Sequence, residues 1–123
     1  MELHESQEMY LETILRLSEK QDKVRAIDVV RELNFSRPSV SIAIKSLKEN
    51  GFLEVLSDQS IILTSRGKEV ANNVYSKHQS LTKLLQSFGV SEKTAEDDAC
   101  RIEHIISDET FDCIKAFLAK EEK

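Results

Sequence analysis

The sequence predicts a mainly α-helical protein with one small β-hairpin, and three observations support this fold class. Apolar residues recur at helical spacing in six segments of the 123-residue chain. Two β-rich runs, Phe52 to Leu56 and Ser60 to Leu63, are separated by the turn-forming residues 57–59. The composition, with 40% hydrophobic and 32% charged residues, 3 Gly and 1 Pro, is typical of a soluble, helix-rich protein.

Three helices are predicted before the hairpin. The first covers Glu8 to Leu17, and the second contains the apolar stripe between Ile27 and Leu33, with Asn34 as the turn residue after it. The third begins at Ser36, a capping residue followed closely by Pro38, whose missing N–H costs nothing in the first turn. It ends at Asn50-Gly51, where a glycine permits the left-handed conformation that stops a helix.

Three further helices are predicted after the hairpin. A long one starts at the Thr64-Ser65 cap and runs to about Gln86. The next opens at Ser91 and continues to about Ile106. Ser107-Asp108 caps the last helix.

Three helices followed by a hairpin are the order of a winged helix-turn-helix, whose third helix enters the major groove of DNA. The segment from Ser36 to Lys48 carries three basic residues and no acidic one, although the chain has a net charge of −5. Small hydroxyls and basic groups at a helix N-terminus can approach bases and phosphates closely. The candidate DNA-binding residues are Ser36, Arg37, Pro38, Ser39, Ser41 and Lys45.

A plainer interpretation of this segment stays open. Ser36 and Ser39 could serve only as helix caps, and the basic residues could simply solvate the surface. At the hairpin, Arg66 and Lys68 are further candidates for phosphate contacts, although exposed basic pairs are common.

The charge is unevenly distributed. Residues 16–77 carry eleven Lys or Arg against eight Asp or Glu, whereas residues 78–123 carry six against ten. A mildly basic middle is therefore flanked by acidic ends, which are either solvated helix faces or ligands for a cation.

The location is predicted to be cytoplasmic. The two cysteines, Cys100 and Cys113, are too few for a disulfide-stabilised secreted scaffold. No stretch reaches the roughly 18 apolar residues that a membrane span requires, and the N-terminus lacks the pattern of an export signal. We therefore expect no membrane partner.

A second constellation points to a metal. On one helix, Cys100, Glu103 and His104 stand at positions i, i+3 and i+4 and so share a face, with Glu96 one turn earlier. A mixed sulfur, oxygen and nitrogen set suits a divalent transition ion and not magnesium or calcium. By spacing alone, the same pattern could be a buried thiol beside an exposed acid and histidine.

Several motifs, in the same order along the chain, resemble the iron- and manganese-dependent repressors, the family of the diphtheria toxin repressor and the manganese transport regulator. They are E-M-Y-L-E at Glu8 to Glu12, S-R-P-S-V-S at Ser36 to Ser41, L-T-S-R-G-K at Leu63 to Lys68, K-H at Lys77-His78, and D-D-A-C-R-I-E-H-I-I-S-D-E at Asp97 to Glu109. The resemblance spans almost the whole chain.

The resemblance implies an activating metal site. In the iron-responsive branch the ligands are a methionine on the first helix and a Cys, Glu and His on the fifth, which fall on Met9, Cys100, Glu103 and His104. In the manganese-responsive branch an Asp and a Glu replace the methionine and the cysteine. Because this chain has the sulfur pair, Fe(II) is favoured, with Mn(II), Co(II), Ni(II) or Zn(II) as alternatives.

A second ion is also implied, with a hybrid set of ligands. His78 matches an ancillary-site histidine of the iron branch, but Thr82 stands where its glutamate is expected and Glu96 where its second histidine is expected. Glu12 matches a carboxylate of the manganese branch. The predicted second site therefore consists of Glu12, His78 and Glu103, with Glu96 as a further candidate.

The implied function is that of a metal-dependent transcriptional repressor that controls genes of metal uptake and homeostasis. It would bind palindromic double-stranded operator DNA as a homodimer, with residues 1–70 as the winged helix-turn-helix domain and residues 71–123 as the helical metal-binding and dimerisation domain. Since the chain stops at Lys123, it resembles the short form without a C-terminal SH3-like domain. The apolar residues expected at the dimer interface are Ile105, Ile106, Phe111, Ile114 and Phe117.

Three alternatives stay open. The chain could be a manganese-responsive member of the same family, or a winged-helix regulator that senses a ligand other than a metal. It could also be a small metallohydrolase with Glu103 as the base beside a metal-bound water. No nucleophile, oxyanion donor or H-E-x-x-H motif accompanies the cluster, so we expect a protein that is not an enzyme.

Overall fold

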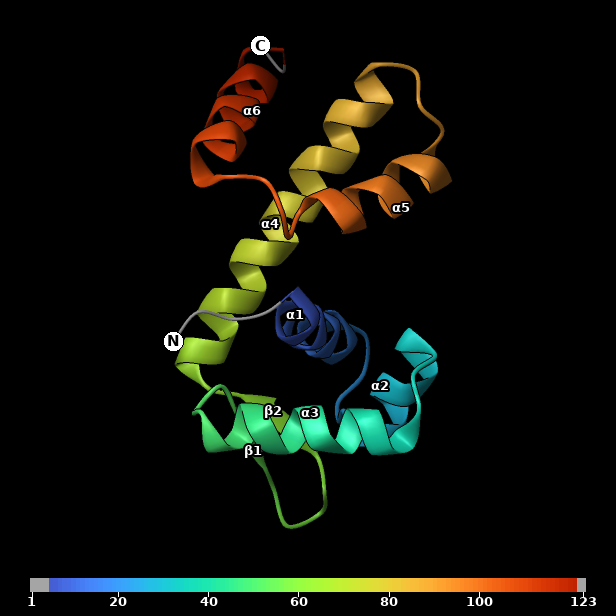
Figure 1. Cartoon of the computed structure of the whole chain (residues 1–123), viewed down its shortest axis with the longest axis vertical. Coiled ribbons are helices and arrows are strands. Elements are labelled where there is room, and N and C mark those ends of the chain that lie inside the picture. The colour runs from blue at the N-terminus through green and yellow to red at the C-terminus, as the bar shows by residue number, and fades with distance from the viewer. Residues whose placement is uncertain (1–4, 122–123) are drawn as a thin grey trace. The chain divides into compact units, whose positions relative to one another are not determined.

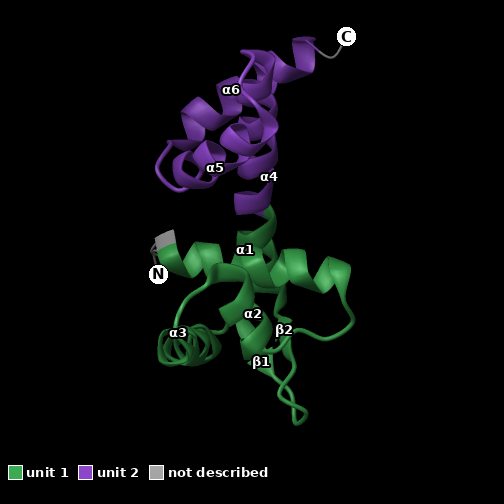
Figure 2. Ribbon diagram, turned by 90° about the vertical axis from the view of Figure 1, so that its right-hand side faces the viewer, with its two compact units in different colours: residues 1–72 green, residues 73–123 purple. Residues whose placement is uncertain are grey.

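The computed structural model describes residues 5–121 and confirms a mainly helical fold with a β-hairpin (Figure 1). The elements are α1 (Glu5–Lys20), α2 (Ala26–Leu33), α3 (Arg37–Glu49), β1 (Leu53–Val55), β2 (Ile61–Leu63), α4 (Ser65–Ser87), α5 (Glu92–Ile102) and α6 (Asp108–Glu121). The chain forms two compact units, residues 1–72 and 73–123, and α4 contributes to both (Figure 2).

The first unit contains α1 to α3, the hairpin and the start of α4, and its helix ends follow the predicted capping residues. Asn34 ends α2 in the left-handed conformation, with φ of 57°. Ser36 is the N-cap of α3, where its Oγ accepts a hydrogen bond from the Ser39 N–H at 3.3 Å. After α3, Gly51 has a φ of 81°, which a residue with a side chain adopts only under strain.

The hairpin follows α3 directly. β1 and β2 pair antiparallel, with Leu53 opposite Leu63 and Val55 opposite Ile61. The Ile61 N–H donates to the Val24 carbonyl at 2.7 Å, so the chain just before α2 joins the edge of β2. The predicted wing is therefore present and is attached to the α1–α2 connection.

A polar contact also holds the tip of the hairpin. Lys23 Nζ donates to Asp58 Oδ2 at 2.8 Å, and the Arg25 Nε donates to the Asp58 carbonyl at 3.2 Å. The hydroxyl and the N–H of Ser60 also donate to the Asp58 carboxylate, at 2.6 and 3.0 Å. The Lys23 hydrogen bond, followed by those from Ser60, lowers the pKa of Asp58 below its ordinary value.

One apolar core lies within the first unit. α1 and α3 pack against the hairpin, and α2 packs against both helices. The side chains with at most 2% exposure are Leu11, Ile14, Val24, Val29, Val40, Leu47, Phe52, Leu53 and Ala71. Because these residues come from the helices and the hairpin alike, burial of the core fixes the position of α3 within this unit.

The start of α4 is held against the end of α3. Thr64 Oγ1 accepts from the Gly67 N–H at 3.1 Å, as predicted for an N-cap, and donates to the Gly51 carbonyl at 2.7 Å. A Cβ added at Gly67 would lie 1.9 Å from the Phe52 carbonyl oxygen. Only glycine allows this approach.

The second unit contains the rest of α4 together with α5 and α6. Lys77 on α4 lies 3.5 Å from the Asp108 carboxylate at the start of α6. The ammonium groups of Lys77 and Lys115 lie 5.8 and 4.9 Å from the centre of the Phe111 ring. Phe111 is only 4% exposed. The prediction that Phe111 offers apolar surface at the dimer interface is therefore wrong.

The predicted extent of α5 is also wrong. The helix ends at Ile102 and not near Ile106, with Glu103 as its C-cap. The N–H groups of Ile105 and Ile106 both donate to the Ile102 carbonyl, at 3.0 and 3.2 Å, which forms a turn. Two β-branched residues in succession and the Ser107 cap of α6 favour this stop, and His104 therefore lies in the turn.

Among the described residues, no helix is long and apolar enough to cross a membrane.

Candidate functional site

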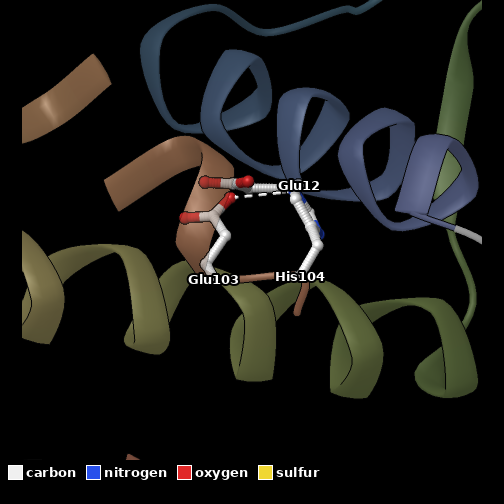
Figure 3. Close-up of side chains that lie close together, drawn as sticks. All are labelled: Glu12, Glu103 and His104. Carbon is white, nitrogen blue, oxygen red and sulfur yellow. Dashed lines mark ion pairs between the residues drawn. The ribbon is translucent and has the colours of Figure 1, made fainter. Parts of the chain in front are cut away.

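The best-defined polar cluster of the second unit is centred on Glu103. Its Oε2 lies 2.9 Å from His78 Nδ1, and its Oε1 lies 3.2 Å from His104 Nε2. Glu103 is 1% exposed, the His104 side chain is fully buried, and His78 is 6% exposed. Figure 3 shows the ion pair between Glu103 and His104. One buried carboxylate thus faces two imidazoles, one through each oxygen.

Local structure explains how these three side chains meet. His78 lies on α4, while Glu103 caps α5 and its N–H donates to the Ala99 carbonyl at 2.9 Å. His104 follows in the turn, so its ring approaches the carboxylate from the neighbouring backbone position. The contact between His78 and Glu103 spans 25 residues of sequence and depends on the packing of the second unit.

The cluster has the chemistry of a divalent transition-metal site. Burying a carboxylate is costly unless positive charge or hydrogen bonds compensate it. Neutral imidazole and carboxylate are common ligands of iron, manganese, cobalt and zinc. A carboxylate has two oxygens, so it can contact a histidine through each of them. The second histidine can orient the carboxylate, or it can join the carboxylate in binding a second ion.

The remaining predicted ligands lie on two helices, α5 and α1. Cys100 lies on α5 one turn before Glu103 and is half-buried, and Glu96 on the same helix is exposed. On α1 of the first unit, Met9 is half-buried and Glu12, also labelled in Figure 3, is 3% exposed. Arg16 NH1 lies 3.5 Å from the Glu12 carboxylate.

Thr82, which stands where a metal-binding glutamate was expected, forms a hydrogen bond within α4. It stands one turn after His78 on α4, and its Oγ1 donates to the His78 carbonyl at 2.8 Å. The hydroxyl therefore satisfies a backbone group of its own helix.

The predicted DNA-binding residues lie together on the first unit. All six, from Ser36 to Lys45, are exposed on α3 or at its N-terminus. A groove of about 500 Å³ borders this surface. It is lined by Arg25, Ala26, Ile27, Ser41, Ile44, Lys45, Lys48, Val55, Gln59 and Ile61. Its three charged lining residues are all basic, which suits an anionic backbone.

Sequence reasoning missed some residues of this surface. Arg25 and Lys48 line the groove, and Ile42 on α3 is 70% exposed. Ile42 stands one turn after Pro38, on the helix face opposite to the buried Val40, and this spacing was readable in the sequence. Arg66 stacks on the Phe52 ring at 4.3 Å and donates to the Asn50 carbonyl at 3.0 Å, while its predicted contact with phosphate stays a prediction.

Two segments of the chain match the two domains of one known protein family. Residues 2–61 match the family described as the N-terminal DNA-binding domain of iron-dependent repressors. Residues 64–123 match the metal-binding and dimerisation domain of the same repressors.

Individual proteins agree with this. The transcriptional regulator MntR of Escherichia coli is 32% identical over 90% of this chain and 72% of its own length. The diphtheria toxin repressor of Corynebacterium diphtheriae is 34% identical over 88% of this chain and 48% of its own. A manganese-dependent transcriptional repressor, solved in complex with manganese, has a TM-score of 0.84 at 27% identity, over 92% of this chain and 52% of its own. The chain thus spans about half the length of the latter two.

These relatives are transcriptional regulators and not enzymes, which decides against the metallohydrolase interpretation. The order of the two matched domains accounts for the winged unit and for the helical unit that contains Glu103. The chain therefore belongs to the family of iron- and manganese-dependent transcriptional repressors.

Proposed function

We propose that this protein represses genes of metal uptake by binding palindromic operator DNA as a homodimer when it is loaded with a divalent metal, with Fe(II) as its principal ion. The observation that carries the proposal is the buried Glu103 carboxylate, which faces His78 at 2.9 Å and His104 at 3.2 Å. Such a cluster suits a divalent cation, which would supply the positive charge that a buried carboxylate requires.

The proposed activating site takes Met9 from α1 and Cys100, Glu103 and His104 from α5 and the turn after it. The bound ion would supply Lewis acidity and positive charge, and these side chains would supply sulfur, oxygen and nitrogen donors. Cys100 would bind as the thiolate. The half-buried positions of Met9 and Cys100 are compatible with this role.

The proposed second site shares Glu103. Its ligands are Glu12, His78 and Glu103, and the two-sided contact of Glu103 supports a carboxylate that serves both ions. Glu96 is the weakest candidate because its side chain is exposed.

The preference for Fe(II) rests on donor chemistry. Thioether and thiolate are soft ligands, whereas Mn(II) prefers an all-oxygen and nitrogen set. The buried Glu12, a hard donor, favours the manganese-responsive alternative, and one of the similar proteins was solved with manganese. The two ions therefore need to be compared directly.

The link from metal to DNA follows from where the ligands lie in the sequence. In the proposed site, Met9 and Glu12 belong to the unit that carries α3, and the other ligands belong to the unit matched as the dimerisation domain. A shared ion would favour one arrangement from an ensemble. In a symmetric dimer, the two α3 helices must lie about 34 Å apart to occupy successive major grooves.

The dimer surface is proposed in the second unit. Ile105 is 74% exposed and Phe117 is 46% exposed, while Ile106 and Ile114 are half-buried. Burying exposed apolar side chains between two copies would stabilise a dimer.

The test is a selection from a randomised duplex library. Purified protein is stripped of metal and then loaded anaerobically with Fe(II), Mn(II), Co(II) or Zn(II), with a chelator as the metal-free sample. We expect a palindromic duplex to be enriched with metal, most strongly with Fe(II), and not with chelator. Equal enrichment with chelator would contradict metal activation and favour a regulator that senses another ligand.

A direct measurement of the site accompanies the selection. Co(II) bound to a thiolate gives an intense sulfur-to-metal charge-transfer band in the near ultraviolet. We expect this band in the native protein and in Cys113→Ser, but not in Cys100→Ser. A band that survives Cys100→Ser would exclude Cys100 as a ligand.

A further inference from the structure

We propose that Ile42 is a base-reading residue, which selects thymine in each operator half-site by packing against the thymine methyl group. The proposal rests on the proposed function, in which α3 enters the major groove. It adds a determinant of sequence specificity that is apolar.

The exposure of Ile42 carries the first step. It is 70% exposed, whereas Val40, Ile44 and Leu47 on the same helix are at most 8% exposed. Isoleucine is among the residues most often buried in soluble proteins. A single exposed isoleucine is not by itself unusual. The role of Ile42 is therefore inferred from the residues around it.

The surroundings of Ile42 are those of a DNA-reading surface. Pro38 and Lys45 stand four residues before and three residues after it, so they lie on the same face of α3. Ser41 is its immediate neighbour, and all three residues are exposed. No acidic residue occurs between Arg37 and Lys48, so no negative charge on this helix segment would repel the phosphates of DNA near Ile42.

The chemistry of the major groove gives Ile42 a defined partner. Thymine alone among the four bases presents a methyl group there, and apolar side chains read it by contact. The nearby serines can hydrogen-bond to several bases, and Lys45 can bind a phosphate, so neither alone identifies thymine. Isoleucine is branched at Cβ and has few rotamers, so little side-chain entropy is lost when it is held against a base.

The test uses the metal-loaded full chain and the duplex obtained from the library selection. Each thymine of the half-site is replaced in turn by uracil, symmetrically in both halves. Uracil keeps the Watson–Crick pairing and the O4 acceptor and lacks only the methyl group. At one position we expect about fourfold weaker binding for each half-site, hence about sixteenfold for the duplex.

The variant Ile42→Ala should remove this discrimination. It should bind the thymine and uracil duplexes equally at that position and keep the native ratios elsewhere. Ile62→Ala serves as the matched control, because Ile62 is an exposed isoleucine of the same unit, on β2 and not on α3. It should retain the native preference for thymine.

The possible failures are distinguishable. If Ile42→Ala keeps the native ratio at every position, or if no position responds to uracil, this proposal is wrong and the proposed function stands. If the native protein selects no duplex with any of the four metals, the proposed function fails and this proposal fails with it. Thermal melts of both variants verify that they are folded.

Discussion

At the scale of single residues, Glu103 is the most deeply buried acid among the described residues. Its carboxylate is 1% exposed and lies between His78 and His104. A buried carboxylate that binds metal must have a cost in the metal-free protein, because desolvation disfavours the charged form. The residue that permits metal binding should therefore limit the stability of the metal-free state.

The variant Glu103→Gln tests whether Glu103 binds metal at the expense of stability in the metal-free protein. We expect the metal-free variant to melt at the same temperature as the native protein or higher, because a neutral amide is easier to bury. The rise in Tm that Co(II) gives to the native protein should be lost, since that rise reflects binding to the folded state. Glu92→Gln, at an exposed position on α5, should keep the full metal response. A variant Glu103→Gln with the native response would contradict the role of Glu103.

Met9 is the residue by which the metal preference can be altered. Met9→Asp replaces a soft thioether by a hard carboxylate, so the response should shift from Fe(II) toward Mn(II). The measurement is the ranking of metals by their apparent Kd for operator binding under anaerobic conditions. Met9→Leu keeps the apolar volume without a ligand and should weaken the response to all metals. An unchanged ranking in Met9→Asp would count against Met9 as a ligand.

At the scale of elements, one close backbone approach and a group of polar contacts hold the hairpin in place. Gly67 at the start of α4 lies against the Phe52 carbonyl, which precedes β1. Lys23 and Arg25, from the α1–α2 connection, hold the tip of the hairpin through Asp58. The hairpin is therefore held at its base and at its tip by contacts that no periodicity in the sequence reveals.

Gly67→Ala should destabilise the protein, although alanine is the better helix former. A Cβ would lie 1.9 Å from the Phe52 carbonyl oxygen, so the backbone must shift. We expect a loss of about 2 kcal/mol or more in the free energy of unfolding, measured by urea denaturation. Asn72→Ala, at an exposed position of α4, should be neutral or slightly stabilising. Equal stability of the Gly67→Ala variant would contradict the close approach.

The wing contact should depend on pH in a defined direction. Because Lys23 lowers the pKa of Asp58, the contact stabilises the fold at pH values above about 3.9, the ordinary pKa of an aspartate. This contribution is lost as the pH falls through the lowered pKa. In a titration of the carboxyl carbon by NMR, Lys23→Met should raise the midpoint of Asp58 toward the ordinary value, and Lys20→Met should not. A native midpoint near 3.9 would show that the contact does not form in solution.

At the scale of the whole molecule, the protein consists of two units that match a DNA-binding domain and a metal-binding and dimerisation domain. In the proposed mechanism the metal has its ligands in both units, so metal occupancy and the DNA-competent arrangement are linked. Linkage of this kind is reciprocal, and operator DNA should therefore increase the affinity for metal.

His104→Ala and Cys100→Ala should separate regulation from assembly. Each should abolish metal-dependent binding to the selected duplex, because each removes a ligand of the proposed activating site. The dimer should persist, because Ile105 and Phe117 are unchanged. Fluorescence anisotropy and sedimentation measure the two properties, and Cys113→Ala is the matched control. Metal-dependent binding that survives both substitutions would refute the site.

The sequence by itself determined the order of elements and most of their ends. Ser36, Asn34, Gly51 and Thr64 act as caps or stops where the pattern predicted them, because capping depends on a few neighbouring residues. The motifs also identified the family and its candidate ligands. Three of these ligands, His78, Glu103 and His104, form a contact cluster, while the metal-binding role of the whole set stays a prediction.

Only the tertiary structure decided which side chains are buried and what they contact. It ended α5 at Ile102, covered Phe111 with two lysines and stacked Arg66 on Phe52. It also left Ile42 exposed and placed His78 against Glu103 across 25 residues of sequence. The physical reason is that caps and helical periodicity are local, whereas burial and contacts depend on partners supplied by distant parts of the chain.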